Sequence, residues 1–141
     1  MKLLLDTHIW IWSALEPDRL SHSVSKALAD PANEIWISPI SIWEILLLSQ
    51  KKRLTLQPDA DGFLADALSR VPLKEATFTH EVALATPQVI LHHHDPVDRF
   101  LAASAKVYGL TLVTSDHHLL AGKGFSVLAN QQLRTHKVVV R

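Results

Sequence analysis

Apolar and polar positions divide this chain into short apolar runs and longer segments with helical spacing. A wholly apolar run bounded by polar residues is typical of a strand buried on both faces of a sheet. Residues 3–5 form such a run, and we also expect strands at 34–37, 110–114 and 125–128, which are rich in apolar and β-branched residues. Residues 71–76 are expected to add a short edge strand, because Pro72 has no amide hydrogen to donate to a neighbouring strand.

Helical segments separate these strands. We expect helices over residues 9–15, 21–29, 59–70, 79–86 and 115–120, over a segment that begins at Ser38 or Ser41 and ends near Lys52, and over a segment that begins at Asp95 and ends at Gly109. The Asp95 segment has the clearest signals, because a capping aspartate is followed by proline in the first turn and glycine marks the end. Strands that alternate with helices predict an α/β fold whose parallel sheet is covered by helices on both faces.

Composition narrows the class of protein. A chain of 141 residues with 48% hydrophobic residues is large and apolar enough for one compact domain. Equal numbers of basic and acidic residues, 14 of each, argue against a protein that binds polyanions through bulk charge. The absence of cysteine excludes disulfides and thiolate metal sites. No apolar run is long enough to span a membrane, so we expect a soluble, cytoplasmic protein.

One acid stands out against its surroundings. In the stretch SPISIWEILLLSQ, Glu44 lies among apolar residues. It fits a capping box that begins at Ser41, in which the glutamate bonds back to the start of the helix. Alternatively, Ser38 caps the helix, Pro39 follows in the first turn and Glu44 lies one turn further in. Both alternatives make Glu44 a structural residue unless other acids gather around it.

Topology predicts that three other acids do gather around Glu44. Asp6 follows the first strand and Asp116 follows the strand at 110–114, so both lie at the carboxyl ends of strands. The helix of Glu44 leaves the second strand at the same edge, and the helix of Asp98 runs back from that edge towards its strand. We therefore expect four carboxylates on one rim of the sheet.

Four carboxylates on one rim repel one another and need a counter-ion. Mg²⁺ and Mn²⁺ prefer oxygen ligands, so a few carboxylates and water molecules suit them. Such a site can activate water and stabilise charge on a phosphate. Each acid also has a simpler interpretation: Asp98 and Asp116 suit the first turns of helices, whereas an aspartate next to a buried strand, as Asp6 is, needs a partner.

These motifs resemble a known family. LLLDTHIWIW, SPISIWEI and HHHDPVDRFLAASAKVYGLTLVTSD are similar to PIN-domain ribonucleases of the VapC toxin type, and the resemblance covers residues 2 to about 128. It implies a PIN-like parallel sheet of about five strands and an endoribonuclease that uses Mg²⁺ or Mn²⁺. It also implies an RNA substrate, a cognate antitoxin protein and often a homodimer. The implied catalytic residues and metal ligands are Asp6, Glu44, Asp98 and Asp116, with a catalytic hydroxyl from Thr114 or Ser115.

Several features of the chain remain open. The predicted domain covers residues 1–130, and the tail 131–141 is not placed. His92, His93 and His94 are adjacent and cannot all face one zinc ion. Arg99 is expected either to approach a phosphate or to pair with Asp95.

Two other functions fit parts of the pattern. A non-catalytic binding or regulatory protein with the same fold is the main alternative to the nuclease. A phosphoryl-accepting receiver domain also has an acid after its first strand, but it requires an acidic pair that Asp6-Thr7-His8 does not supply.

Overall fold

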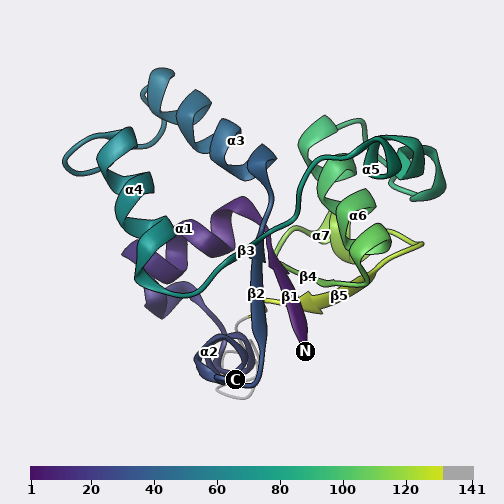
Figure 1. Ribbon diagram of the computed structural model, residues 1–141, viewed down its shortest axis with the longest axis horizontal. Coiled ribbons are helices and arrows are strands. Elements are labelled where there is room, and N and C mark those ends of the chain that lie inside the picture. The colour runs from purple at the N-terminus through teal and green to yellow at the C-terminus, as the bar shows by residue number, and fades with distance from the viewer. Residues whose placement is uncertain (132–141) are drawn as a thin grey trace, which may run out of the picture.

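The computed structural model describes residues 1–131, which form a five-stranded parallel sheet with helices on both faces (Figure 1). The strands are β1 (Lys2–Leu5), β2 (Glu34–Ile37), β3 (Lys74–Glu75), β4 (Thr111–Thr114) and β5 (Ser126–Ala129). Their order across the sheet is β3-β2-β1-β4-β5, and all neighbouring pairs are parallel. The chain therefore builds the sheet in one direction from β1 and then in the other. The crevice between β1 and β4, where the direction changes, is where such sheets bind ligands.

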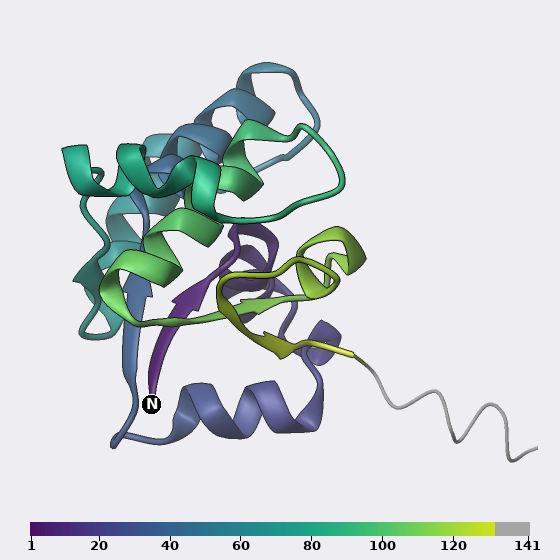
Figure 2. The same cartoon turned by 90° about the vertical axis from the view of Figure 1, so that its right-hand side faces the viewer.

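Seven α-helices and two short 3₁₀ helices connect the strands of the described chain. The α-helices are α1 (Thr7–Leu15), α2 (His22–Ala29), α3 (Pro39–Gln50), α4 (Ala60–Arg70), α5 (His80–Ala85), α6 (Pro96–Tyr108) and α7 (His117–Leu120), and the 3₁₀ helices are Pro17–Arg19 and Thr86–Gln88. In Figures 1 and 2, α1, α3 and α4 lie on the opposite side of the central strands from α5 and α6. The predicted α/β fold with both faces covered is confirmed.

The two faces of the sheet form separate hydrophobic cores. Leu3 and Leu5 of β1 pack into a core with α1, α2 and α4, whereas Leu4 packs on the other face against α6. Successive strand side chains point to opposite faces, so an apolar strand supplies both cores at once. Each fully buried leucine contributes about 1.5–3 kcal/mol relative to an exposed one. These cores hold β1 in place, and with it Asp6, the residue that follows β1.

Polar side chains begin most of the helices and settle one question that the sequence left open. Ser38 Oγ accepts a hydrogen bond from the backbone N–H of Ile40 at 3.1 Å, so Ser38 caps α3 and Pro39 follows it. Ser41 lies inside the helix and is buried. The capping box from Ser41 to Glu44 is therefore wrong, because an acid in the second turn is too far along the helix to bond back to its cap.

Other predicted boundaries differ only slightly. Helix α1 begins at Thr7 rather than residue 9, because the chain turns into a helix directly after Asp6. The predicted edge strand at 71–76 is confirmed but is reduced to Lys74–Glu75, the outermost strand of the sheet. Among residues 1–131, no helix is both long and apolar enough to cross a membrane. From residue 132 onward, the predicted tail lies outside the described residues, so a domain over 1–130 with a separate tail stays a prediction.

Candidate active site

The four predicted acids reach one edge of the sheet from four different elements. Asp6 directly follows β1, Asp116 lies two residues after β4, Glu44 is in the second turn of α3 and Asp98 is in the first turn of α6. All four line a single cavity of about 240 Å³, which we call the acid cavity. Its other lining residues are His8, Trp12, Asp95 and Ser115. The structure thus brings together side chains that are up to 110 positions apart in the sequence.

Asp6 is buried and is held by a hydroxyl group from the neighbouring strand. Its side chain accepts a hydrogen bond from Thr114 Oγ1 at 2.7 Å, and the same hydroxyl oxygen accepts one from the backbone N–H of Asp116 at 3.0 Å. Burial raises the pKa of Asp6, Glu44 raises it further, and the Thr114 bond and His8 oppose that rise. Thr114 therefore connects two of the acids and stabilises the ionised form of one of them.

Asp98 is the second buried acid and has an imidazole partner. Its Oδ2 atom lies 2.8 Å from His93 Nε2, and the residue is only 6% exposed. Burial raises the pKa of Asp98 to about 7, and the neighbouring carboxylates of Asp95, Asp6 and Asp116 add to that rise, whereas the His93 bond opposes it. A carboxyl group with such a pKa exchanges its proton near neutral pH, which is unusual for an aspartate.

The remaining acids and the two candidate hydroxyls have distinct surroundings. Glu44 is partly buried, and Asp116 caps α7 by accepting the backbone N–H of His118 at 2.8 Å. Ser115 is exposed and lines the acid cavity, whereas Thr114 is fully buried behind Asp6. The two hydroxyls are therefore not equivalent: Thr114 holds an acid, and Ser115 is accessible to a bound molecule.

The donor atoms of the acid cavity fit a hard divalent cation. Five carboxylates line it (those of Asp6, Glu44, Asp95, Asp98 and Asp116), and no lysine or arginine of the described chain is among its lining residues. The raised pKa values show that ionising the two buried acids without a counter-charge is unfavourable. Oxygen donors of this kind suit Mg²⁺ and Mn²⁺. Within residues 1–131, the possible ligand atoms of His93, Asp95 and Asp98 all lie within 4.8 Å of one another.

The sequence did not reveal the role of His93. Of the three adjacent histidines, His92 and His94 are exposed, and His93 turns inward to Asp98. The spacing gave only part of the signal: residues just before the Asp95 cap lie close to the first turn of α6, but the spacing does not distinguish His93 from its two neighbours. Arg99 does not pair with Asp95: its Nη1 donates to the backbone carbonyls of Thr86 and Val89 at 2.9 and 3.2 Å. Its approach to a phosphate stays a prediction.

A second hollow, the side cavity, adjoins the acid cavity. It measures about 370 Å³ and is lined by Trp12, Asp18, Arg19, Ser115 and Asn130, so it shares Trp12 and Ser115 with the acid cavity. The Arg19 guanidinium lies over the Trp12 ring at 4.2 Å from the centroid. Asn130 fixes the adjoining loop, because its Oδ1 accepts the backbone N–H of Ser21 at 2.6 Å and its Nδ2 donates to the carbonyl of Arg19 at 3.2 Å.

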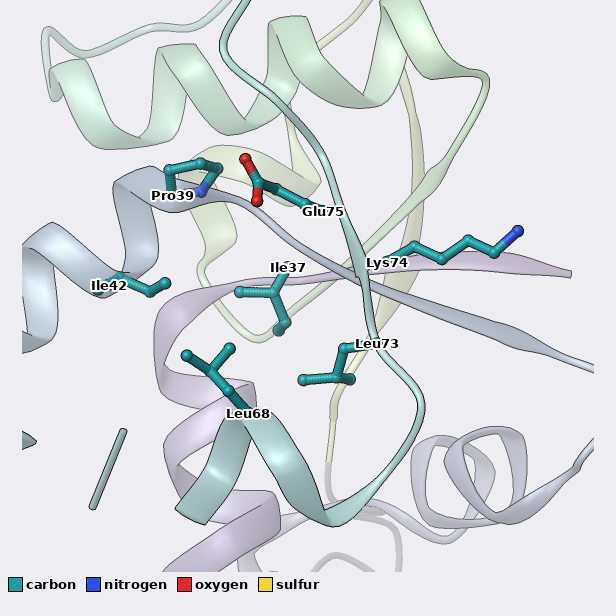
Figure 3. A pocket seen from close by; sticks show the side chains of 7 residues that line it. All are labelled: Ile37, Pro39, Ile42, Leu68, Leu73, Lys74 and Glu75. Carbon is teal, nitrogen blue, oxygen red and sulfur yellow. The ribbon is translucent and has the colours of Figure 1, made fainter. Parts of the chain in front are cut away.

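An apolar groove of about 290 Å³ lies between α3, α4 and the edge strand β3 (Figure 3). Its lining residues are Ile37, Pro39, Ile42, Leu68, Leu73, Lys74 and Glu75. In Figure 3 the side chains of Ile37, Leu68 and Leu73 gather in the groove, and that of Lys74 extends away from it. This groove offers apolar surface rather than catalytic groups, so it suits the side chains of another protein more than a reaction.

Comparisons with known proteins found a family model and a relative that match most of the chain. The family model described as PIN domain matches residues 3–123. Ribonuclease VapC22 of Mycobacterium tuberculosis (strain ATCC 25618 / H37Rv) is 32% identical over 120 residues, which cover 83% of this chain and 88% of that protein.

Solved structures with similar folds include two toxin–antitoxin assemblies. One is VapBC2 from Rickettsia felis bound to a promoter DNA fragment, with a TM-score of 0.70 and 20% identity over 93% of this chain and 100% of that one. The other is DNA-bound VapBC from Salmonella typhimurium, with a TM-score of 0.67 and 19% identity over 93% and 99% of the two chains. These likenesses agree with the five-stranded fold described above.

Proposed function

This chain belongs to the PIN domain family, of the VapC type, and on that premise we propose that it is an endoribonuclease that requires Mg²⁺ or Mn²⁺ and acts as the toxin of a toxin–antitoxin pair. One observation carries the proposal. Five carboxylates converge on the acid cavity at the carboxyl edge of the sheet, and two of them, Asp6 and Asp98, are buried there. Burying two acids so close to three others is unfavourable unless a cation is bound.

The residues that would hold the ion are Asp6, Glu44, Asp98 and Asp116. A bound divalent ion supplies water activation and electrostatic stabilisation of a phosphodiester that is being cleaved. Thr114 keeps Asp6 oriented, and the exposed hydroxyl of Ser115 is available to contact a substrate phosphate. The pKa of Asp98 is about 7 without an ion, and a bound cation would favour its ionised form, which is the form that binds a metal.

The side cavity gives an RNA strand a place to lie beside the acids. RNA is negatively charged and is repelled by the carboxylates of the acid cavity. A positively charged side chain next to that cavity is therefore needed to bind it. Arg19 provides this charge, and Trp12 with Arg19 provides flat surfaces of the kind on which unpaired bases stack. Cleavage of single-stranded RNA fits this arrangement.

Cleavage by purified protein tests the enzymatic part of the proposal. Wild type, Asp6→Asn and the control Asp61→Asn would be incubated with RNA in Mn²⁺ or in EDTA. Asp61 is exposed in the first turn of α4 and lies outside the acid cavity. We expect cleavage by wild type and the control in Mn²⁺ only, and a loss of at least about 100-fold in Asp6→Asn. Full activity of folded Asp6→Asn would refute the proposed site. If wild type neither binds Mn²⁺ nor cleaves RNA, the non-catalytic binding protein is favoured.

An antitoxin partner and a homodimer complete the proposal. The apolar groove of Figure 3 and the exposed side chains of Trp43 and Leu68 offer surface for a protein partner. We expect expression of the chain in a bacterium to arrest growth, and co-expression of the adjacent small gene to relieve the arrest. Sedimentation of the purified chain, alone and with that partner, tests the homodimer and the complex. Normal growth with intact RNA would contradict the toxin role.

A further inference from the structure

Three histidine rings form a stack beside the acid cavity. The His93 ring lies 4.4 Å from that of His118 with 20° between their planes, and His117 lies 4.3 Å from His118 on α7. Only His93 of the three contacts an acid of the cavity through its side chain, by the 2.8 Å bond to Asp98. Through the bond from His93 to Asp98, the stack therefore connects α6, which carries Asp98, with α7, which follows Asp116.

The bond to His93 fixes the orientation of the Asp98 carboxylate. A carboxylate that is held through one oxygen cannot rotate freely, so its second oxygen, Oδ1, keeps a fixed direction. Asp6 is held in the same manner, since its Oδ2 accepts the hydroxyl of Thr114. Each buried acid thus has one oxygen, Oδ2, engaged by a neighbouring side chain. Groups that orient metal ligands in this manner commonly affect metal affinity as strongly as some ligands do.

The other nitrogen of His93 limits how the ring can be protonated. Nδ1 is buried and has no hydrogen-bond partner among the described residues. A proton on Nδ1 would be a buried donor without an acceptor, which is costly. The tautomer with its proton on Nε2, which donates to Asp98, is therefore favoured. With Nε2 engaged in this bond, His93 acts on the cavity through Asp98.

We propose that His93 is a positioning residue of the metal centre, which donates to Asp98 Oδ2 so that the other carboxylate oxygen faces the ion, and that His118 holds the His93 ring in place by stacking. This inference rests on the proposed function, because it presupposes that a divalent ion binds in the acid cavity.

Mn²⁺ affinity, measured by calorimetry on the full chain, tests the inference without an activity assay. We expect His93→Ala to bind Mn²⁺ about 10–100-fold more weakly than wild type. His93→Gln should recover part of this loss, because its amide can donate to Asp98. His118→Ala should give a smaller loss of affinity. The matched control is His92→Ala, since His92 is adjacent but exposed, and its affinity should equal that of wild type.

Electron paramagnetic resonance of bound Mn²⁺ separates positioning from direct ligation. We expect no coupling to imidazole nitrogen in wild type; a coupling that disappears in His93→Ala would make His93 a ligand and overturn the inference. Unchanged Mn²⁺ affinity of folded His93→Ala would overturn it as well, while leaving the proposed nuclease intact. Wild type that binds no Mn²⁺ would overturn both. Thermal melts in EDTA establish that each variant is folded.

Discussion

Thr114 Oγ1 donates to Asp6 Oδ2 at 2.7 Å and accepts the backbone N–H of Asp116 at 3.0 Å. This single hydroxyl, at the end of β4, therefore connects the acid after β1 with the acid after β4. The two strands are neighbours, and Leu5 pairs with Val113 immediately before this contact. A small displacement between the central strands would change the distance between the two acids.

Thr114→Val should impair both the site and the fold. Valine has nearly the same shape but no hydroxyl, so Asp6 loses a hydrogen bond and the Asp116 N–H loses its acceptor. We expect a decrease of about 1–3 kcal/mol in the free energy of unfolding and about 10–100-fold lower RNA cleavage. Urea unfolding and RNA cleavage assays measure the two effects. Thr114→Ser should stay close to wild type, and Ser115→Ala should leave stability unchanged because Ser115 is exposed. Equal stability of Thr114→Val and wild type would contradict the structural role.

Asp98→Asn should stabilise the ion-free protein at neutral and alkaline pH. The folded protein holds a proton on Asp98 with a pKa of about 7, whereas the ordinary value is 3.8. The proton-linked stabilisation is therefore present below about pH 4 and is lost as the pH rises through 7. Asparagine stays neutral, so in EDTA at pH 8 the variant should melt about 3 °C or more above wild type, with a smaller difference at pH 4.

Thermal melts across this pH range check the prediction for Asp98. Added Mn²⁺ should raise the Tm of wild type more than that of Asp98→Asn, since an ion that binds only the folded state stabilises it. Asp66→Asn is the control, because Asp66 is exposed and pairs with Arg70. A Tm difference between Asp98→Asn and wild type that does not change with pH would show that the Asp98 carboxyl does not titrate as described.

Arg19→Ala should weaken RNA binding without altering the chemistry. Arg19 lines the side cavity and not the acid cavity. Removing one phosphate contact should raise KM several-fold, leave kcat unchanged and reduce the salt dependence of binding by about one unit of slope. Steady-state cleavage at several salt concentrations measures these values. The control is Arg70→Ala. Arg19 pairs with Glu16 and Arg70 pairs with Asp66, both on the surface, but Arg70 lines neither cavity. If both variants have the same KM as wild type, RNA does not follow the side cavity.

The sequence predicted the acid cavity because its acids are positioned by strand order. In a parallel sheet, a residue directly after a buried strand must lie at the carboxyl edge, so Asp6 and Asp116 could be placed without coordinates. A helix that follows or precedes a parallel strand also begins at the carboxyl edge, so Glu44 and Asp98 could be placed there as well. The strand 34–37 was also predicted with its observed limits, since its apolar residues 35–37 lie between Glu34 and Ser38.

Contacts made by long side chains were not predictable in this way. His93 was one of three adjacent histidines, and nothing in the sequence said which one would turn towards Asp98. Arg99 likewise had charged candidates nearby, and it instead donates to the carbonyls of Thr86 and Val89. The hydrogen-bond partner of a long side chain depends on which polar groups lie near it in the folded chain. Tertiary packing determines this, and the sequence alone does not show it.

The hydrogen bonds of Asn130 can form only late in the synthesis of the chain. Asn130 accepts the backbone N–H of Ser21, which lies 109 positions earlier in the chain, and donates to the carbonyl of Arg19. The wall of the side cavity beside Trp12 is therefore completed by a residue that follows β5. During synthesis, Asp6 and Glu44 are therefore made well before Asn130 can form these hydrogen bonds. The wall of the side cavity can therefore be complete only after the last strand has been synthesised.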